Sequence, residues 1–317
     1  MMKPCLFLMF IAAVSVVGVR AQDGQAIFDR GVQQAQAKQF TEAIASFSEF
    51  ARQQPTEAAA PFNIGVCYYT LERYTDALPF FTKALELKPD YTDAYVYKGN
   101  TLDLLGRFNE AIATYTKGLD VDPKSPALYY ELGVAHSNQK DHRAAAEDYE
   151  KCISLDAQNF NCLTGAGKAY NAITRYSDAR RVLIKAIDID PMNAPAEFEM
   201  GNAHYNDGNF AQSVPHYKRA VELSPKFKTA LRYLADAYAN LHQNDLAIAA
   251  YSQVIVLDPH HTGAIAGLAS VYIASKDKLH SMEQIEKLQT LDPQRAVKLL
   301  AAWNTTFATT SPAVTRQ

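Results

Sequence analysis

A period of 34 residues runs through almost the whole chain and constrains its fold more than any other feature. Prolines stand at positions 55, 89, 123, 191, 225, 259 and 293, glycines at 31, 65, 99, 133, 167 and 201, and alanines at 43, 77, 111, 145, 179 and 247. Neighbouring members of each set are 34 residues apart, or 68 where one member is missing. Three residue types that share one period indicate tandem copies of one unit, which stack to bury a continuous core.

The repeat frame contains eight units with no insertion between them. Their boundaries are 24–57, 58–91, 92–125, 126–159, 160–193, 194–227, 228–261 and 262–295. Glycine lies at position 8 of the unit, alanine at position 20 and proline at position 32. A glycine inside a helix costs about 1 kcal/mol relative to alanine, so a repeated one indicates a close helix crossing. Proline cannot donate the next backbone hydrogen bond, and it predicts the end of the second helix of each unit.

Position 24 carries a large side chain in every unit, which we expect to fill the space between units. These residues are Phe47, Phe81, Tyr115, Tyr149, Leu183, Tyr217, Tyr251 and Ile285. The second unit carries Ile64, Gly65, Tyr68, Ala77, Phe81 and Pro89 in register. This pattern resembles the tetratricopeptide-repeat (TPR) family, W-x2-L-G-x2-Y, then A-x3-F, then P. The resemblance covers all eight units and implies an all-α, right-handed superhelical solenoid of antiparallel helix pairs.

Both ends of the chain fall outside the repeat frame. Residues 294–303 are predicted to form a capping helix, with Leu299, Leu300 and Trp303 on its apolar face. A terminal unit of a solenoid otherwise exposes its packing surface to water. Residues 304–317 contain Thr, Ser and Pro with little to bury, and we expect them to be disordered.

Residues 1–21 have the pattern of a secretory signal peptide. Lys3 precedes an apolar run from Leu6 to Val17, and Val19 and Ala21 are small residues suited to cleavage. The run is shorter than the ~20 residues that a membrane-spanning helix needs, although an uncleaved anchor remains an alternative. We therefore expect a periplasmic or secreted protein that begins at Gln22.

The remaining cysteines are Cys67, Cys152 and Cys162. Cys67 is expected to be a small buried hydrophobe inside a helix. Cys152 and Cys162 flank one turn between units, and export would permit a disulfide there. Two unpaired thiols are the favoured interpretation of Cys152 and Cys162, with the disulfide as the alternative.

No constellation of residues predicts catalysis, a cofactor or a metal site. The formal net charge of −3 gives no polybasic footprint for nucleic acid. His136 and His204 occupy position 11, where the family has Tyr, and are interpreted as packed helix residues rather than metal ligands. Too little chain lies outside the repeats to hold a separate enzyme, so we expect a non-catalytic protein.

The family resemblance places the first helices of the units on a concave surface, which positions 2, 5, 6, 9, 12 and 13 face. Tyr and Asn dominate there and charges are few, which suits an extended peptide read through its main chain. The predicted protein-binding residues are Phe62, Asn63, Tyr69, Tyr97, Asn100, Tyr130, Asn138, Asn171, Phe198, Asn202, Tyr205, Asn206, Arg232, Tyr233 and Asn240. The alternative is that these positions are ordinary solvated helix faces. The surface is expected to be nearly neutral, with binding only weakly dependent on salt.

TPR co-chaperones bind a C-terminal carboxylate with Lys at position 5 and Asn at position 9 of one unit. No unit here has that pair, since Arg232 at position 5 is followed by Asp236 at position 9. The expected function is a scaffold that binds a protein or peptide, without a carboxylate-clamp ligand, nucleic acid or membrane insertion after signal cleavage. The alternative is a fixed subunit of a bacterial envelope assembly, secretion or cell-wall complex.

Overall fold

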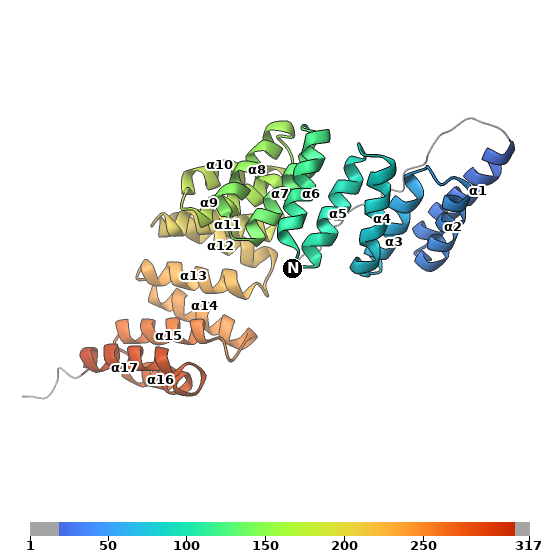
Figure 1. Ribbon diagram of the computed structural model, residues 1–317. Helices are drawn as coiled ribbons and strands as arrows, with labels where there is room; N and C mark the ends of the chain where they lie inside the picture. Colours follow the sequence, from blue (N-terminus) through green and yellow to red (C-terminus); the bar gives the residue numbers. More distant parts are fainter. Residues whose placement is uncertain (1–18, 308–317) are drawn as a thin grey trace, which may run out of the picture. The chain divides into compact units, whose positions relative to one another are not determined.

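Helices account for all the regular structure that the computed structural model shows over the residues it describes, 19–307, with side chains described from residue 24 (Figure 1). The first helices of the eight repeats are α1 (Val19–Gln36), α3 (Ala59–Thr70), α5 (Thr92–Leu104), α7 (Pro126–Asn138), α9 (Phe160–Ala172), α11 (Ala194–Asn206), α13 (Lys228–Asn240) and α15 (Thr262–Ala274). The second helices are α2 (Phe40–Gln53), α4 (Tyr74–Leu87), α6 (Phe108–Val121), α8 (His142–Leu155), α10 (Tyr176–Ile189), α12 (Phe210–Leu223), α14 (Asn244–Leu257) and α16 (Lys278–Leu291), and α17 (Pro293–Phe307) follows them.

The ends of the chain differ in part from the prediction. Residues 1–18 of the predicted signal peptide and 308–317 of the predicted tail lie outside the described residues. The expectation of disorder is wrong for 304–307, which continue α17 to Phe307. That helix packs on α15 and α16, and the Trp303 Nε1 donates to Ser281 Oγ at 3.0 Å. The cap therefore extends one turn beyond the predicted 294–303.

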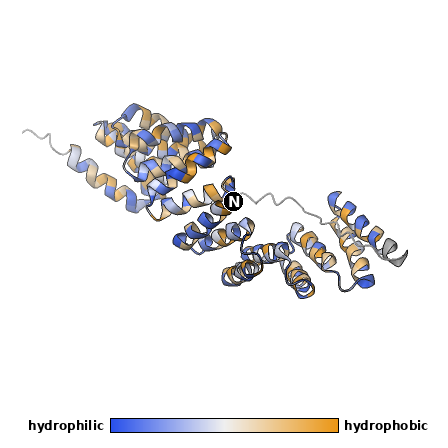
Figure 2. Cartoon of the chain, turned by 90° about the horizontal axis from the view of Figure 1, so that it is seen from above, coloured by the Kyte–Doolittle hydropathy of each residue, from blue (hydrophilic) through white to orange (hydrophobic). Residues whose placement is uncertain are grey.

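The chain also divides into two larger compact bodies of helices, with the division between Cys162 and Leu163 in α9. These bodies are called unit 1 and unit 2 below, and the 34-residue units are called repeats. Unit 1 contains the described residues up to Cys162, and unit 2 those from Leu163 onward. In both, hydrophobic residues recur along each helix with hydrophilic ones between them (Figure 2). Each helix packs on the helices next to it in sequence, as a solenoid requires.

The glycine of position 8 lies under the large side chain of position 24 in the same repeat. A Cβ added to Gly65 would lie 2.7 Å from the Phe81 ring, and one added to Gly133 would lie 2.7 Å from the Tyr149 ring. No real side chain tolerates such a contact, so the predicted close crossing is confirmed. Phe81 also packs with Tyr97 of the next repeat, as expected for a residue between repeats.

The turn between the two helices of a repeat uses a left-handed residue at position 15 in all eight repeats. It is glycine only twice, at Gly106 and Gly208. The other six are Lys38, Glu72, Lys140, Thr174, His242 and Lys276, with φ between 56° and 66°. In the second repeat the backbone N–H of Arg73 donates to Tyr68 O at 2.9 Å, closing a Schellman turn.

Neighbouring repeats meet through position 27 of one and position 3 of the next. Ala84 faces this junction with Ala94, whereas Gly118 leaves room for Leu128, whose methyl groups would lie about 2.9 Å from an added Cβ. At the same two positions Cys152 and Cys162 form a disulfide with a Cα–Cα distance of 6.2 Å. The favoured prediction of unpaired thiols is therefore wrong, because the repeat geometry brings positions 27 and 3 together. Cys67 is a free, buried thiol as expected.

Candidate functional site

The first helices of consecutive repeats approach one another directly, and their exposed surface is called the first-helix face below. In unit 1, α3 contacts α5 and α5 contacts α7, and in unit 2 α13 contacts α15. Among the described residues no pair of second helices makes contact of this extent. Closer approach on one side curves a stack toward that side, so the first helices line the inner side within each unit.

Four of the predicted binding residues are too buried to contact a partner directly. Exposure is 1% for Phe62, 0% for Asn63, 6% for Tyr97 and 6% for Asn100. The prediction that their side chains lie open to a partner is wrong, because each packs into the layer beneath the first-helix face. Eight others are partly exposed: Tyr69, Tyr130, Asn171, Phe198, Asn202, Tyr205, Arg232 and Tyr233. The exposed ones are Asn138, Asn206 and Asn240.

The aromatic residues form the same six-ring cluster twice, 136 residues or four repeats apart. Aromatic cluster 1, in unit 1, contains Phe62, Tyr69, Tyr74, Phe81, Tyr91 and Tyr97. Aromatic cluster 2, in unit 2, contains Phe198, Tyr205, Phe210, Tyr217, Phe227 and Tyr233.

The geometry of the two clusters is nearly the same. The ring centroids of Tyr69 and Tyr97 are 5.5 Å apart at 83°, and those of Tyr205 and Tyr233 are 5.7 Å apart at 82°. Edge-to-face pairs at such distances stabilise the layer beyond their buried area. Because the constellation recurs as a whole, it is a structural unit larger than one repeat.

The asparagines of the first-helix face are largely engaged by neighbouring helices. Asn138 Nδ2 donates to Asp103 Oδ2 at 2.9 Å, Asn171 Nδ2 to Glu199 O at 2.9 Å, and Asn240 Nδ2 to Tyr205 Oη at 3.2 Å. These bonds tie one repeat to the next. They leave fewer amide groups to read a peptide main chain than the sequence analysis expected.

Two carboxylates of the face in unit 1, Asp103 and Glu131, belong to the neighbouring helices α5 and α7. The Tyr115 hydroxyl donates to Asn100 Oδ1, and Asn100 Nδ2 donates to Glu131 Oε1 at 3.2 Å. Burial raises the pKa of Glu131 to about 7, although the Asn100 bond opposes this, and the Asp103 charge raises it further. Burial also raises the pKa of Asp103. Both raised pKa values reduce the negative charge of this part of the face near neutral pH, so the expectation of a nearly neutral surface stays a prediction.

In unit 2 the corresponding region contains its own cation. The guanidinium of Arg232 lies 4.0 Å from the centroid of the Tyr233 ring and 2.5 Å from Asp236 Oδ2. The Tyr251 hydroxyl donates to the other oxygen of Asp236. This carboxylate is thus fully paired within the chain.

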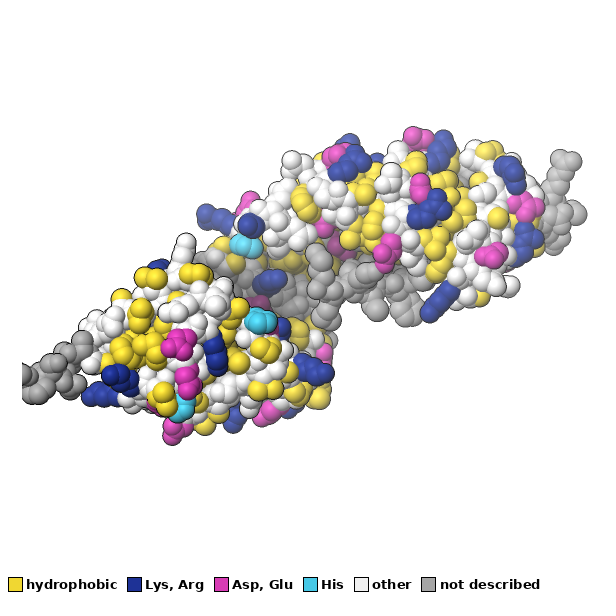
Figure 3. All heavy atoms as spheres, turned by 90° about the horizontal axis from the view of Figure 1, so that it is seen from below, with side chains coloured by type: hydrophobic (Ala, Val, Ile, Leu, Met, Phe, Trp, Pro, Cys, Tyr) yellow, Lys and Arg dark blue, Asp and Glu magenta, His cyan; other side chains and the backbone are white. Residues whose placement is uncertain are grey.

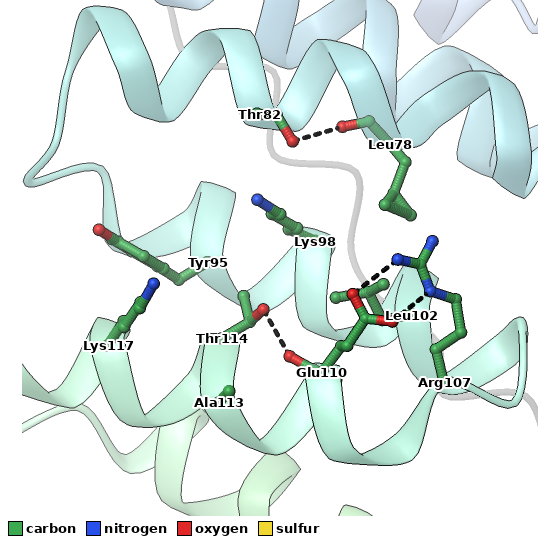
Figure 4. Close-up of a pocket in the computed structure, with 10 residues that line it drawn as sticks. All are labelled: Leu78, Thr82, Tyr95, Lys98, Leu102, Arg107, Glu110, Ala113, Thr114 and Lys117. Carbon is green, nitrogen blue, oxygen red and sulfur yellow. Dashed lines mark hydrogen bonds and ion pairs between the residues drawn. The ribbon is translucent and has the colours of Figure 1, made fainter.

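A pocket of about 370 Å³ lies away from the first-helix face, between α4, α5 and α6 (Figure 4). Arg107 donates to both carboxylate oxygens of Glu110, at 2.7 and 2.6 Å. Burial lowers the pKa of Lys98, and the charge of Lys117 lowers it further. Mixed charges also mark the wider surface: on the face drawn in Figure 3, Lys and Arg are interspersed with Asp and Glu. Because basic and acidic side chains both line the pocket, its residues do not favour one class of ligand.

The histidines pack as the sequence analysis expected. His136 Nδ1 lies 2.6 Å from Asp148 Oδ2, and His204 stacks on His216 with centroids 5.5 Å apart. Over the described residues no group of three or more His, Cys, Asp and Glu side chains is arranged to hold a metal ion. In the same range, no helix has the length and apolar character needed to cross a membrane.

Family models of the tetratricopeptide repeat match the chain at residues 62–91, 80–113, 99–140, 126–159 and 198–262. Together they cover more than half of the chain and follow the helix pairs described above. The chain is a TPR protein. No curated protein sequence matches it significantly.

Solved TPR structures share the fold at low sequence identity. YrrB, described as a TPR protein with an unusual peptide-binding site, is 22% identical over 58% of this chain and 95% of its own, with a TM-score of 0.53. PilF of Pseudomonas aeruginosa is 19% identical over 66% and 96%, with a TM-score of 0.57. The C-terminal part of a TPR protein from Cytophaga hutchinsonii is 22% identical over 76% and 99%, with a TM-score of 0.62. YrrB and the Cytophaga hutchinsonii protein are described as TPR proteins, so the similarity supports the TPR solenoid fold.

Sequence reasoning missed the acidic members of this TPR surface as site residues. Asp103 and Glu131 each occupy an inward position of the repeat, but they were not among the predicted protein-binding residues. The structure distinguishes them from Asp236 of unit 2, which pairs with Arg232, because neither forms an ion pair among the described residues of unit 1.

Proposed function

We propose that this TPR protein is an exported, non-catalytic scaffold that binds a protein or extended peptide segment along its first-helix face. The observation that carries the proposal is the partly exposed aromatic surface of that face, with Tyr69 and Tyr130 in unit 1 and Tyr205 and Tyr233 in unit 2. Tyrosine gives a broad contact area at low cost in side-chain entropy and a hydroxyl for hydrogen bonding. TPR membership supports a protein as the partner.

Export is proposed on two observations. The first is the signal-like pattern of residues 1–21, and the second is the Cys152–Cys162 disulfide. Disulfides persist in the periplasm and outside the cell and are rare in a reducing cytosol. N-terminal sequencing of the exported protein is expected to give Gln22. Recovery of an intact Met1 form from the cytosol contradicts export and leaves the binding proposal unaffected.

The binding surface is tested by a photo-crosslinking amino acid at Tyr130, with the adjacent Tyr129 as the matched control. Both tyrosines lie in α7 and are partly exposed, but Tyr129 occupies position 4, whose counterpart Tyr95 lines the pocket away from the first-helix face. Crosslinks to a protein are expected from position 130 and not from position 129. The reverse pattern would place binding among the second helices and contradict the proposal, as would catalytic activity of the purified protein.

The number of partners distinguishes an adaptor from a fixed subunit. A single stoichiometric partner crosslinked at position 130 favours a subunit of an envelope complex. Many substoichiometric partners favour a scaffold that reads a class of peptides. Tyr130→Ala is expected to weaken partner binding by about tenfold or more, since aromatic anchors dominate binding energy.

A further inference from the structure

The two aromatic clusters have rings at the same six repeat positions but differ in the charged groups beside them. Arg232, which covers Tyr233 in unit 2, corresponds to Val96 in unit 1, 136 residues earlier. Unit 1 therefore has no cation at that position, although Lys88 lies 5.0 Å from the centroid of the Tyr91 ring of the same cluster. In its place the region contains two carboxylates, Asp103 of α5 and Glu131 of α7.

The two carboxylates of unit 1 are incompletely satisfied within the chain. Asn138 donates to one oxygen of Asp103, and Asn100 donates to one oxygen of Glu131. The other oxygen of Asp103, Oδ1, is buried and has no hydrogen-bond partner. Among the described residues, no Lys, Arg or His forms an ion pair with either carboxylate. An unpaired buried charge is costly, and a cation brought to it recovers part of that cost.

The Tyr69 hydroxyl belongs to the same region of the face. The negative charges of Glu131 and Asp103 both raise its pKa, after burial, which is the larger cause. The Tyr69 ring lies edge-to-face with Tyr97, as Tyr205 does with Tyr233 in the cluster that Arg232 covers. A cation here is attracted by carboxylates and by an aromatic ring. Among side chains, the guanidinium of arginine satisfies both, because it is planar and donates in a fork that matches a carboxylate.

We propose that unit 1 binds a basic side chain of its partner, arginine in preference to lysine, against Tyr69 and the carboxylates of Asp103 and Glu131. The proposal rests on the proposed function and names the chemistry of the bound segment. Arg232 in unit 2 lies over Tyr233, the counterpart of Tyr97, and pairs with Asp236, which stands where unit 1 has Asn100. It shows that a guanidinium and a carboxylate fit together beside a ring cluster of this type. In unit 1, the basic side chain beside the rings of aromatic cluster 1 is supplied by the partner.

The test is selection of a random peptide library, displayed on phage, on the full-length protein with its disulfide intact. The test variant is Asp103→Asn with Glu131→Gln, which keeps the shape and removes both charges. The control variant is Asp120→Asn with Glu147→Gln, which removes two exposed carboxylates of α6 and α8 in the same unit. Wild type and control are expected to enrich peptides with arginine at one fixed position. The test variant is expected to lose that enrichment.

Calorimetry of one selected peptide and its citrulline analogue, which is nearly isosteric and uncharged, gives the second measurement. Citrulline is expected to weaken binding to wild type and control by about tenfold or more, and to leave binding to the test variant almost unchanged. Higher salt is expected to reduce the arginine preference. Circular dichroism spectra equal to that of wild type and cooperative unfolding of every variant show that the change is not one of folding.

The outcomes separate this inference from the proposed function. Selected peptides without an enriched basic residue, or equal binding of arginine and citrulline by wild type, overturn the inference and leave a peptide-binding face in place. Arginine enrichment that persists in the test variant also overturns it, because the cation then binds elsewhere. A library that yields no binding peptide overturns both.

Discussion

At the scale of single residues, a tyrosine at position 24 connects the packing of its repeat to the first-helix face. The Tyr115 ring lies over Gly99, and its hydroxyl reaches Asn100 at position 9. Tyr217 and Asn202 repeat this arrangement, with a bond of 2.9 Å. The tyrosine hydroxyl at position 24 thus fixes the orientation of the asparagine side chain at position 9. Asn202→Ala would leave the Tyr217 hydroxyl without this partner, so Asn202 is a structural residue as well as a surface one.

The first prediction concerns the helix crossing at Gly133. Gly133→Leu is expected to destabilise the protein by about 1–3 kcal/mol, because any Cβ there meets the Tyr149 ring. Urea unfolding measures the change. Ala127→Leu places the same side chain on an exposed site of the same helix, and it is expected to change stability by no more than about 0.5 kcal/mol. Equal stability of the two variants would show that the crossing tolerates a side chain.

The second prediction concerns the ionisation of Glu131. Burial raises its pKa from 4.5 to about 7, so the folded protein holds a proton that the unfolded chain releases. The stability associated with this proton is fully present below about pH 4.5 and is lost as pH rises through about 7. Besides burial, the hydrogen bond from Asn100 lowers the pKa of Glu131 and the charge of Asp103 raises it.

Glu131→Gln removes this dependence while keeping the shape of the side chain. Relative to wild type, the variant is expected to gain about 2–3 kcal/mol of stability between pH 4 and pH 8. Thermal and urea unfolding across that range measure the difference. A constant difference at all pH values would show that Glu131 ionises normally.

At the scale of elements, the turn within each repeat carries backbone strain that the sequence pattern did not reveal. Position 15 is left-handed in every repeat, yet six of the eight residues there are not glycine. The repeated glycine at position 8 predicts the helix crossing. Position 15 has no common residue type, so the sequence does not predict its left-handed conformation. Its conformation is fixed by the Schellman hydrogen bonds that close the first helix, and these depend on tertiary packing.

Thr174 is the least suitable of these residues, because a β-branched side chain clashes in the left-handed region. Thr174→Gly is expected to stabilise the protein by about 1 kcal/mol. The matched change is Gly208→Thr, at the same position of the next repeat, which is expected to destabilise it by a similar or larger amount. Melting temperatures check both. A loss of stability in Thr174→Gly would mean that the entropy of the unfolded chain outweighs the relief of strain.

At the scale of the whole molecule, the period in Pro, Gly and Ala was sufficient to predict the TPR fold and the helix pairs. The binding face was predicted less well. Repeat position identifies which side of a helix faces inward, but Tyr97 and Asn100 show that an inward residue can be buried by the next repeat. The duplicated aromatic cluster and the missing cation of unit 1 depend on contacts between repeats. Such contacts appear only when the helices are placed side by side.

The disulfide offers a test of how stability is distributed along the chain. Cys152 and Cys162 occupy positions 27 and 3, where three other junctions have alanine pairs: Ala84 with Ala94, Ala186 with Ala196 and Ala220 with Ala230. Cys152→Ala with Cys162→Ala is therefore expected to fit its site and to remove only the cross-link, at a cost of about 2–3 kcal/mol. In a solenoid each repeat contacts only its neighbours, so the loss is expected to stay local.

Amide hydrogen exchange of the oxidised wild type and the double alanine variant measures this distribution. Protection is expected to fall in α8 and in the first turn of α9, and to remain unchanged in α1, α2, α16 and α17, which lie several repeats away. Adding a reductant to wild type is expected to reproduce the local loss, and adding it to the variant is expected to have no effect. A uniform loss of protection from α1 to α17 would contradict the local model, because it requires the eight repeats to unfold as one cooperative block.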